Sequence, residues 1–110
     1  MAFPQNIVKD RRESGQKLSS LVAQLIDRFA KENPATYFEK NNRENISIYL
    51  PLYAIALIKE YYESNFRDDE KKEEVLYLYG HKVVVGYENK LIVAHRDAPL
   101  YPNLVVLLDL

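Results

Sequence analysis

The sequence predicts an α+β domain in which an antiparallel sheet of about five strands packs against two main helices. Three observations indicate this class. Apolar residues recur with helical period over residues 16–32, a second and almost wholly apolar helix is expected at 52–66, and residues 75–96 have the pattern of three short strands joined by tight turns. The expected order is α-β-β-α-β-β-β, followed by an apolar C-terminal strand or short helix. We expect residues 1–110 to form a single domain.

The first helix is predicted from Gln16 to Glu32. Its apolar side chains are spaced three and four residues apart, which places them on one face of a helix with 3.6 residues per turn. The opposite face is polar and mixed in sign. Pro34 ends the helix, because the residue before a proline disfavours helical backbone angles.

The start of this helix has two interpretations. Ser14 is a candidate N-cap, which would begin the helix near Gln16. Alternatively, Asp10 and Glu13 form a capping box and begin it earlier. Gly15 would then lie inside the helix, at a cost of about 1 kcal/mol relative to alanine. Residues 1–13 are accordingly expected to be a flexible or helical N-terminal arm.

A hairpin is expected next. Residues 35–40 and 46–50 are short segments rich in β-branched and aromatic residues, and the polar stretch 41–45 between them is typical of a turn. Pro51 then suits the first position of the second helix, where its missing N–H is not needed.

The second helix, predicted over Leu52–Phe66, is apolar around most of its circumference, which is typical of a central helix or an interface. Eight consecutive charged residues follow at 67–74 and are interpreted as a linker. Its carboxylates could bind a hard cation, but the interleaved lysines and arginine favour a solvated segment. The five apolar residues at 104–108 are expected to dock as a strand or a short helix.

The run 75–96 is the most informative part of the chain. Two-residue turns at Gly80-His81 and Asn89-Lys90 would make it an antiparallel meander, and His81 is expected to be solvated there. The expected pairs are Leu78–Val83, Leu76–Val85, Val85–Ala94 and Tyr87–Ile92.

Both faces of this meander are mostly apolar. Covering about 400 Å² of apolar surface would contribute on the order of 10 kcal/mol gross, so a second cover is expected. The helices and the C-terminal segment could supply it, and so could a second copy of the chain. The expected core side is Leu76, Leu78, Val83, Val85, Tyr87, Ile92 and Ala94; the other face is Val75, Tyr77, Tyr79, Lys82, Val84, Glu88, Leu91, Val93 and His95.

Nine tyrosines suggest a contact surface, because tyrosine combines rigid apolar area with a polar tip. The expected interface residues are Tyr61, Tyr62, Tyr77, Tyr79, Val84 and Val93. A second hypothesis places a small-ligand or acid–base site at Tyr77, Lys82 and His95. The alternative for these three residues is a polar rim on a mostly buried face.

Several chemistries are disfavoured. Cysteine is absent, which excludes disulfides and thiolate sites, and three glycines leave no phosphate-binding fingerprint. We expect no cofactor, no metal and no catalytic site. The net charge of −1 argues against nucleic acid, although Lys9, Arg11, Arg12 and Lys17 form a local basic cluster. With neither a signal-peptide pattern nor a membrane span in the sequence, a cytoplasmic protein is expected.

The order of elements is similar to that of roadblock-type and profilin-like domains, a resemblance that would make the chain a dimeric or partner-binding module. The residues themselves favour a non-catalytic protein-interaction module of the small adaptor, immunity or virus-encoded inhibitor type. We expect it to self-associate as a homo-oligomer, and a different protein partner is also compatible with the sequence. The alternative is a small-ligand-binding domain or minor enzyme that uses the Tyr77, Lys82 and His95 cluster.

Overall fold

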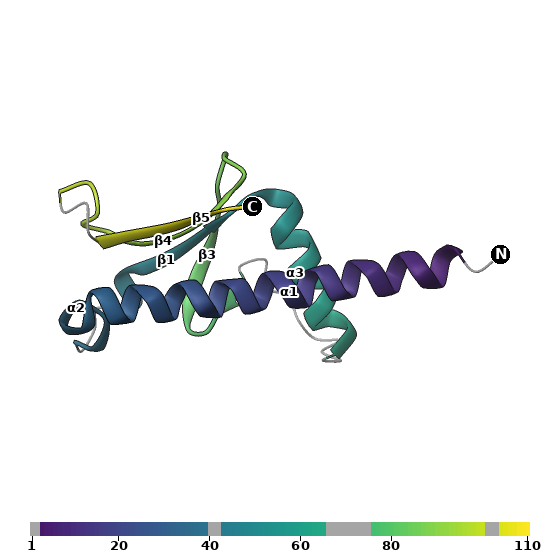
Figure 1. Cartoon of the computed structure of the whole chain (residues 1–110), viewed down its shortest axis with the longest axis horizontal. Coiled ribbons are helices and arrows are strands. Elements are labelled where there is room, and N and C mark those ends of the chain that lie inside the picture. The colour runs from purple at the N-terminus through teal and green to yellow at the C-terminus, as the bar shows by residue number, and fades with distance from the viewer. Residues whose placement is uncertain (1–2, 40–42, 66–75, 101–103) are drawn as a thin grey trace.

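The computed structural model describes residues 3–39, 43–65, 76–100 and 104–110 and confirms the α+β class (Figure 1). Within these residues, three helices and one 3₁₀ turn accompany a five-stranded sheet. The helices are α1 (Phe3–Glu32), α2 (Pro34–Phe38) and α3 (Leu52–Asn65), and the 3₁₀ turn is Arg43–Asn45. The strands are β1 (Ile46–Leu50), β2 (Tyr77–Leu78), β3 (His81–Val85), β4 (Lys90–His95) and β5 (Val105–Asp109).

Helix α1 begins at Phe3, well before the start predicted at Gln16. The alternative of a helical N-terminal arm therefore describes residues 3–13, and Gly15 lies inside the helix. Helix α3 follows its predicted span as far as Asn65. The charged linker expected at 67–74 lies outside the described residues.

The strand predicted at 35–40 was wrong, because Pro34 starts the short helix α2 instead. One helical turn directs Tyr37 into the core, where its ring centroid lies 6.4 Å from that of Phe29 and 5.8 Å from that of His81. The aromatic and β-branched composition that suggested a strand serves here to bury one tyrosine.

The sheet is mixed, in the order β2-β3-β1-β4-β5. Strand β1 runs parallel to β3 and antiparallel to β4, so the fully antiparallel sheet and the β3–β4 meander were wrong predictions. Tyr49 lies between Val84 and Ile92, and neither Val85–Ala94 nor Tyr87–Ile92 is a pair. The physical reason is burial: Ile46, Ile48 and Leu50 all lie in the core, and the central position in the sheet provides neighbours on both sides.

The turn between β2 and β3 is Tyr79-Gly80, not Gly80-His81. Both turn residues have positive φ, 54° at Tyr79 and 86° at Gly80, as a type I′ hairpin turn requires. The observed pairs are Tyr77 with Lys82 and Leu78 with His81. His81, expected to be solvated, is buried.

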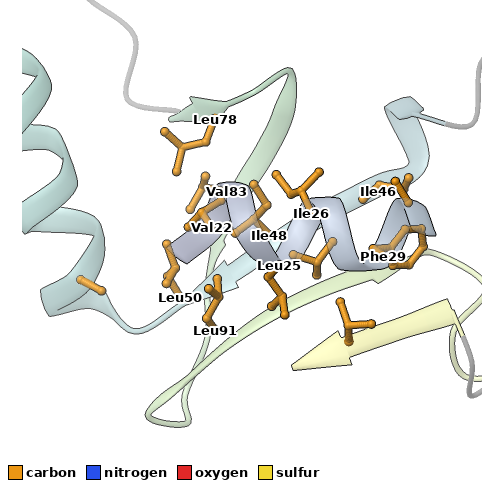
Figure 2. Close-up of a cluster of buried hydrophobic side chains, with 14 of the residues drawn as sticks. Val22, Leu25, Ile26, Phe29, Ile46, Ile48, Leu50, Leu78, Val83 and Leu91 are labelled. Carbon is orange, nitrogen blue, oxygen red and sulfur yellow. The ribbon is translucent and has the colours of Figure 1, made fainter. Parts of the chain in front are cut away.

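One face of the sheet packs against α1. Figure 2 shows Val22, Leu25, Ile26 and Phe29 of α1 among inward side chains of the sheet. The inward positions alternate along each strand, as the pleat requires. The buried sheet residues are Ile46, Ile48, Leu50, Leu78, His81, Val83, Leu91, Val93, His95 and Val106. The C-terminal segment, predicted as a strand or short helix, is the edge strand β5.

Candidate interaction surface

The sheet face that points away from α1, which we call the outer face, carries two rows of neighbouring side chains. In Figure 1, α1 runs along one side of the sheet and no described helix crosses the other side. The first row is Tyr77, Lys82, Ser47, Ala94 and Val105. The second row, which we call the apolar row, is Val84, Tyr49, Ile92 and Leu107.

The apolar row crosses four adjacent strands without a charged side chain. Val84, Tyr49 and Ile92 are half-buried because they flank one another, and Leu107 on the edge strand is 45% exposed. The whole outer face, with strands about 4.8 Å apart and 3.3 Å long per residue, has a footprint of roughly 350 Å², of which the apolar row is only a part. Contiguous apolar patches on the surface of a monomer are often functional.

Two of the six predicted interface residues lie on the outer face. Tyr77, 58% exposed, occupies its edge at β2, and Val84 belongs to the apolar row. Val93 lies on the opposite face and is 0% exposed, so it offers no surface to a partner. The assignment of β4 to the two faces was reversed: Ile92 and Ala94 point outward, whereas Leu91, Val93 and His95 point into the core.

The hydroxyl groups of Tyr62 and Tyr79 both contact Ser19 of α1, although the Tyr79 side chain is 47% exposed. The Ser19 Oγ lies 2.9 Å from the Tyr62 hydroxyl and 3.1 Å from that of Tyr79, and the Tyr79 hydroxyl donates to the Ser19 carbonyl oxygen at 3.2 Å. Burial raises the pKa of the Tyr62 phenol, while its hydrogen bond with Ser19 acts in the opposite direction. This cluster ties α1 to α3 and holds the β2–β3 turn, in which Tyr79 has its unusual positive φ.

Tyr61 lies where α1 crosses α3. Its ring centroid is 5.1 Å from that of Tyr62, and its Cβ would be 2.8 Å from a Cβ added at Gly15. Gly15 therefore permits a helix approach that no other residue allows. Tyr61 and Tyr62 pack within the chain, and the outer face is formed by other residues.

The three residues of the expected ligand site are not brought together. Tyr77 and Lys82 are cross-strand partners on the outer face. His95 is 5% exposed and pairs with Ile46 on the core side. The sheet itself separates the imidazole from the lysine, so these side chains cannot act jointly on one ligand.

His95 is instead a buried structural residue with one unmatched nitrogen. Its Nδ1 accepts a hydrogen bond from the Asp97 backbone N–H at 3.1 Å, which assigns the proton of the neutral ring to Nε2. Within the described part of the chain, Nε2 is buried without a hydrogen-bond partner. The Asp97 carboxylate lies 3.7 Å from Nδ1.

The basic cluster is partly used within the chain. Arg11 donates from Nε to Glu60 Oε1 at 2.8 Å and also pairs through its terminal guanidinium nitrogen, which joins α1 to α3. This hydrogen bonding lowers the pKa of Glu60. Arg12 and Lys17 are exposed.

Within the described ranges, no three His, Cys, Asp or Glu side chains converge in a way that would hold a metal ion. Among the same residues, no helix is both long enough and apolar enough to span a bilayer.

The central residues of the outer face were not among the predicted site residues. Tyr49 lies in a segment whose faces were not assigned, Ile92 was expected in the core, and Leu107 was expected only to dock. A usable signal was present at 46–50, where Ser47 and Tyr49 alternate with three aliphatic residues and must therefore share the opposite face.

Comparison of the chain with protein-family models, with curated proteins and with solved structures gave no match. The resemblance to roadblock-type and profilin-like domains thus rests on element order alone. The observed order also departs from the expected one at one point, where the helix α2 replaces the first expected strand. Any functional conclusion therefore depends on the geometry of the outer face.

Proposed function

We propose that this chain is a non-catalytic protein-interaction module that self-associates through the outer face of its sheet. One observation carries the proposal: the apolar row Val84, Tyr49, Ile92 and Leu107 crosses four strands with no described helix over it. Covering such a row removes apolar surface from water, which is the main driving force of protein association.

The anatomy of this face supports a protein partner. The apolar row is free of charge, and the charged residues Lys82, Lys90 and Asp109 lie outside it, as in interfaces with an apolar centre and a polar rim. A second copy is the partner we propose, because a net charge of −1 opposes the approach of two identical chains only weakly.

The size of the face sets the expected strength. Two faces of roughly 350 Å² would bury about 700 Å² in total, below the 1,200–2,000 Å² that stable complexes usually bury. The dimer should therefore be weak and reversible, with dissociation at micromolar concentration or above. An obligate dimer would need more surface than this face provides.

Sedimentation velocity over a concentration series tests the proposal. The wild-type protein should shift from monomer to dimer as its concentration rises. Tyr49→Glu places a carboxylate at the centre of each face, and like charges brought together there should weaken the dimer at least a hundredfold, an effect on the order of 3 kcal/mol. Tyr87→Glu is the matched control, because Tyr87 is 100% exposed and lies outside both rows.

Tyr77→Glu, at the more exposed edge of the same face, is a milder second variant, and circular dichroism establishes that each variant is folded. A wild-type protein that remains monomeric at all concentrations contradicts the proposal. So does a folded Tyr49→Glu protein in which the methyl signals of Val84 and Ile92, on the outer face, still shift with concentration as they do in the wild type. A ligand-binding or enzymatic function that uses Tyr77, Lys82 and His95 together is disfavoured, because the sheet separates His95 from the other two residues.

A further inference from the structure

The two edges of the sheet differ in how they are protected. Strand β2 forms one edge and has only two residues, which offers a second chain little backbone to pair with. Strand β5 forms the other edge with the five residues VVLLD. It contains no proline and no lysine, the residues that usually prevent an edge strand from pairing with another chain.

The hydrogen bonds of β5 show which of its backbone groups are free. The Leu110 N–H donates to the Asn89 carbonyl oxygen at 3.1 Å, and these two residues lie opposite each other in the β4–β5 register. Opposite residues of an antiparallel pair alternate between pairs that exchange backbone hydrogen bonds and pairs that do not. Leu108 and Val106, which lie two and four residues before Leu110, therefore also direct their N–H and C=O groups toward β4. Val105, Leu107 and Asp109 therefore direct theirs outward, where no described strand pairs with them.

We propose that β5 pairs antiparallel with β5 of a second copy, in the register centred on Leu107. Each Leu107 then lies opposite Leu107 of the second copy, and each Val105 lies opposite Asp109. The three outward N–H groups and three outward C=O groups of each strand are all used, which gives six hydrogen bonds between the copies. The pairing is two-fold symmetric, and because Leu107 is the middle one of the three outward residues, the axis passes through the Leu107 pair.

The side chains favour this register. On the outer face leucine meets leucine, and on the other face Val106 lies opposite Leu108. A register centred on Asp109 would instead place two carboxylates opposite each other, which destabilises strand pairs. In the Leu107 register, each Asp109 stays beside Lys90 of its own chain, with which it pairs across β4 and β5.

The contact between the two β5 strands is distinct from the outer-face contact of the proposed function. The two-fold axis runs perpendicular to the sheet, so pairing at β5 leaves both outer faces open on the same side. Because Leu107 is the last member of the apolar row, edge pairing joins the two rows end to end. The two contacts can therefore be tested separately on the full chain.

Amide hydrogen exchange, read by NMR at two or more protein concentrations, tests the edge contact. The N–H groups of Val106 and Leu108 should exchange slowly at every concentration, because they bond to β4. The N–H of Leu107 should exchange slowly only when the copies pair, by about fifteenfold at a total protein concentration one hundred times the dissociation constant, where about 7% of the chains are still monomeric. Leu107 exchange that is fast and independent of concentration would overturn the inference.

Variants separate the edge from the face. Tyr49→Glu acts on the outer face and should leave the protection of Leu107 intact, whereas Asp109→Pro removes an outward N–H and should abolish it. Asp109→Asn keeps that N–H and is the matched control. If the Leu107 N–H still exchanges slowly in Asp109→Pro, the proposed register is wrong. The proposal is also wrong if this N–H exchanges slowly in the wild type only after a different protein is added.

Discussion

Replacing Gly15 with alanine tests how closely α1 and α3 approach. A Cβ at this position would lie 2.2 Å from the Leu57 carbonyl oxygen and 2.8 Å from the Tyr61 Cβ. The oxygen belongs to the backbone of α3, so no change of rotamer relieves the contact. To reach ordinary contact distance the two helices must separate by about 1 Å or more.

Two effects of opposite sign decide the outcome. Alanine is favoured over glycine inside a helix by about 1 kcal/mol. Overpacking a well-packed contact costs about 1–3 kcal/mol, and a collision with backbone belongs at or above the upper end of that range. Separation of the helices also disturbs the bond between Ser19 and Tyr62, one turn further along α1. We expect a net destabilisation of about 2 kcal/mol, hence a Tm lower by about 8–16 °C.

Urea and thermal denaturation followed by circular dichroism measure this difference. Gln16→Ala is the matched control, because Gln16 is exposed on the same helix and its replacement should change the free energy of unfolding by less than about 0.5 kcal/mol. A Gly15→Ala protein as stable as the wild type, or more stable, would refute the close crossing of the two helices.

Two further predictions concern polar contacts. Tyr79→Phe removes the hydroxyl bonded to Ser19 and should lower the free energy of unfolding, measured in urea melts, by about 1 kcal/mol. The control is Tyr77→Phe, on the exposed edge, which should change the free energy of unfolding little. Equal effects of the two substitutions would contradict the assigned hydrogen bonds. The Arg11 hydrogen bond lowers the pKa of Glu60, so its contribution to stability is present above the unfolded value of about 4.3 and is lost as pH falls through the lower folded value. The stability gap between wild type and Glu60→Gln should therefore close in acid, and a gap unchanged from pH 7 to pH 3 would exclude the pair.

The helical part of the fold could be predicted because its signal is local. The spacing of apolar residues such as Val22 and Phe29 sets the buried face of α1, and both side chains lie in the core. The early start of α1 was harder to predict, because Gly15 has a low helix propensity. Its presence is explained only by α3, a segment more than forty residues away, whose backbone needs the space.

The sheet order could not be predicted in the same way. Strands 81–85 and 90–95 are close in sequence and were expected to pair, but β1 lies between them. Strand pairing depends on which segments bury the most apolar surface together, and no local pattern reports this. Because β4 was expected to pair with β3 and not with β1, the sequence-based assignment of its two faces was reversed. Val93 and His95, expected on the contact surface, therefore lie in the core.

The turn at Tyr79-Gly80 illustrates a second limit. Glycine followed by histidine is a reasonable two-residue turn, whereas a tyrosine with φ of 54° is not expected from propensity. The hydrogen bonds of Tyr79 with Ser19 offset this local strain. The sequence placed Tyr77 and Val84 together on one face of the sheet. The central residues of the outer face could not be predicted, because they depend on the positions of β1 and β5 in the sheet.

The most direct test of self-association through the outer face is a dilution series of methyl NMR spectra on the wild-type protein. The methyl signals of Val84 and Ile92, on the outer face, should move with concentration along a single binding curve, while those of Ile48 and Val93, in the core, should stay in place. Outer-face methyl signals that are identical from the lowest to the highest concentration would show that this face remains in water, and would contradict the account.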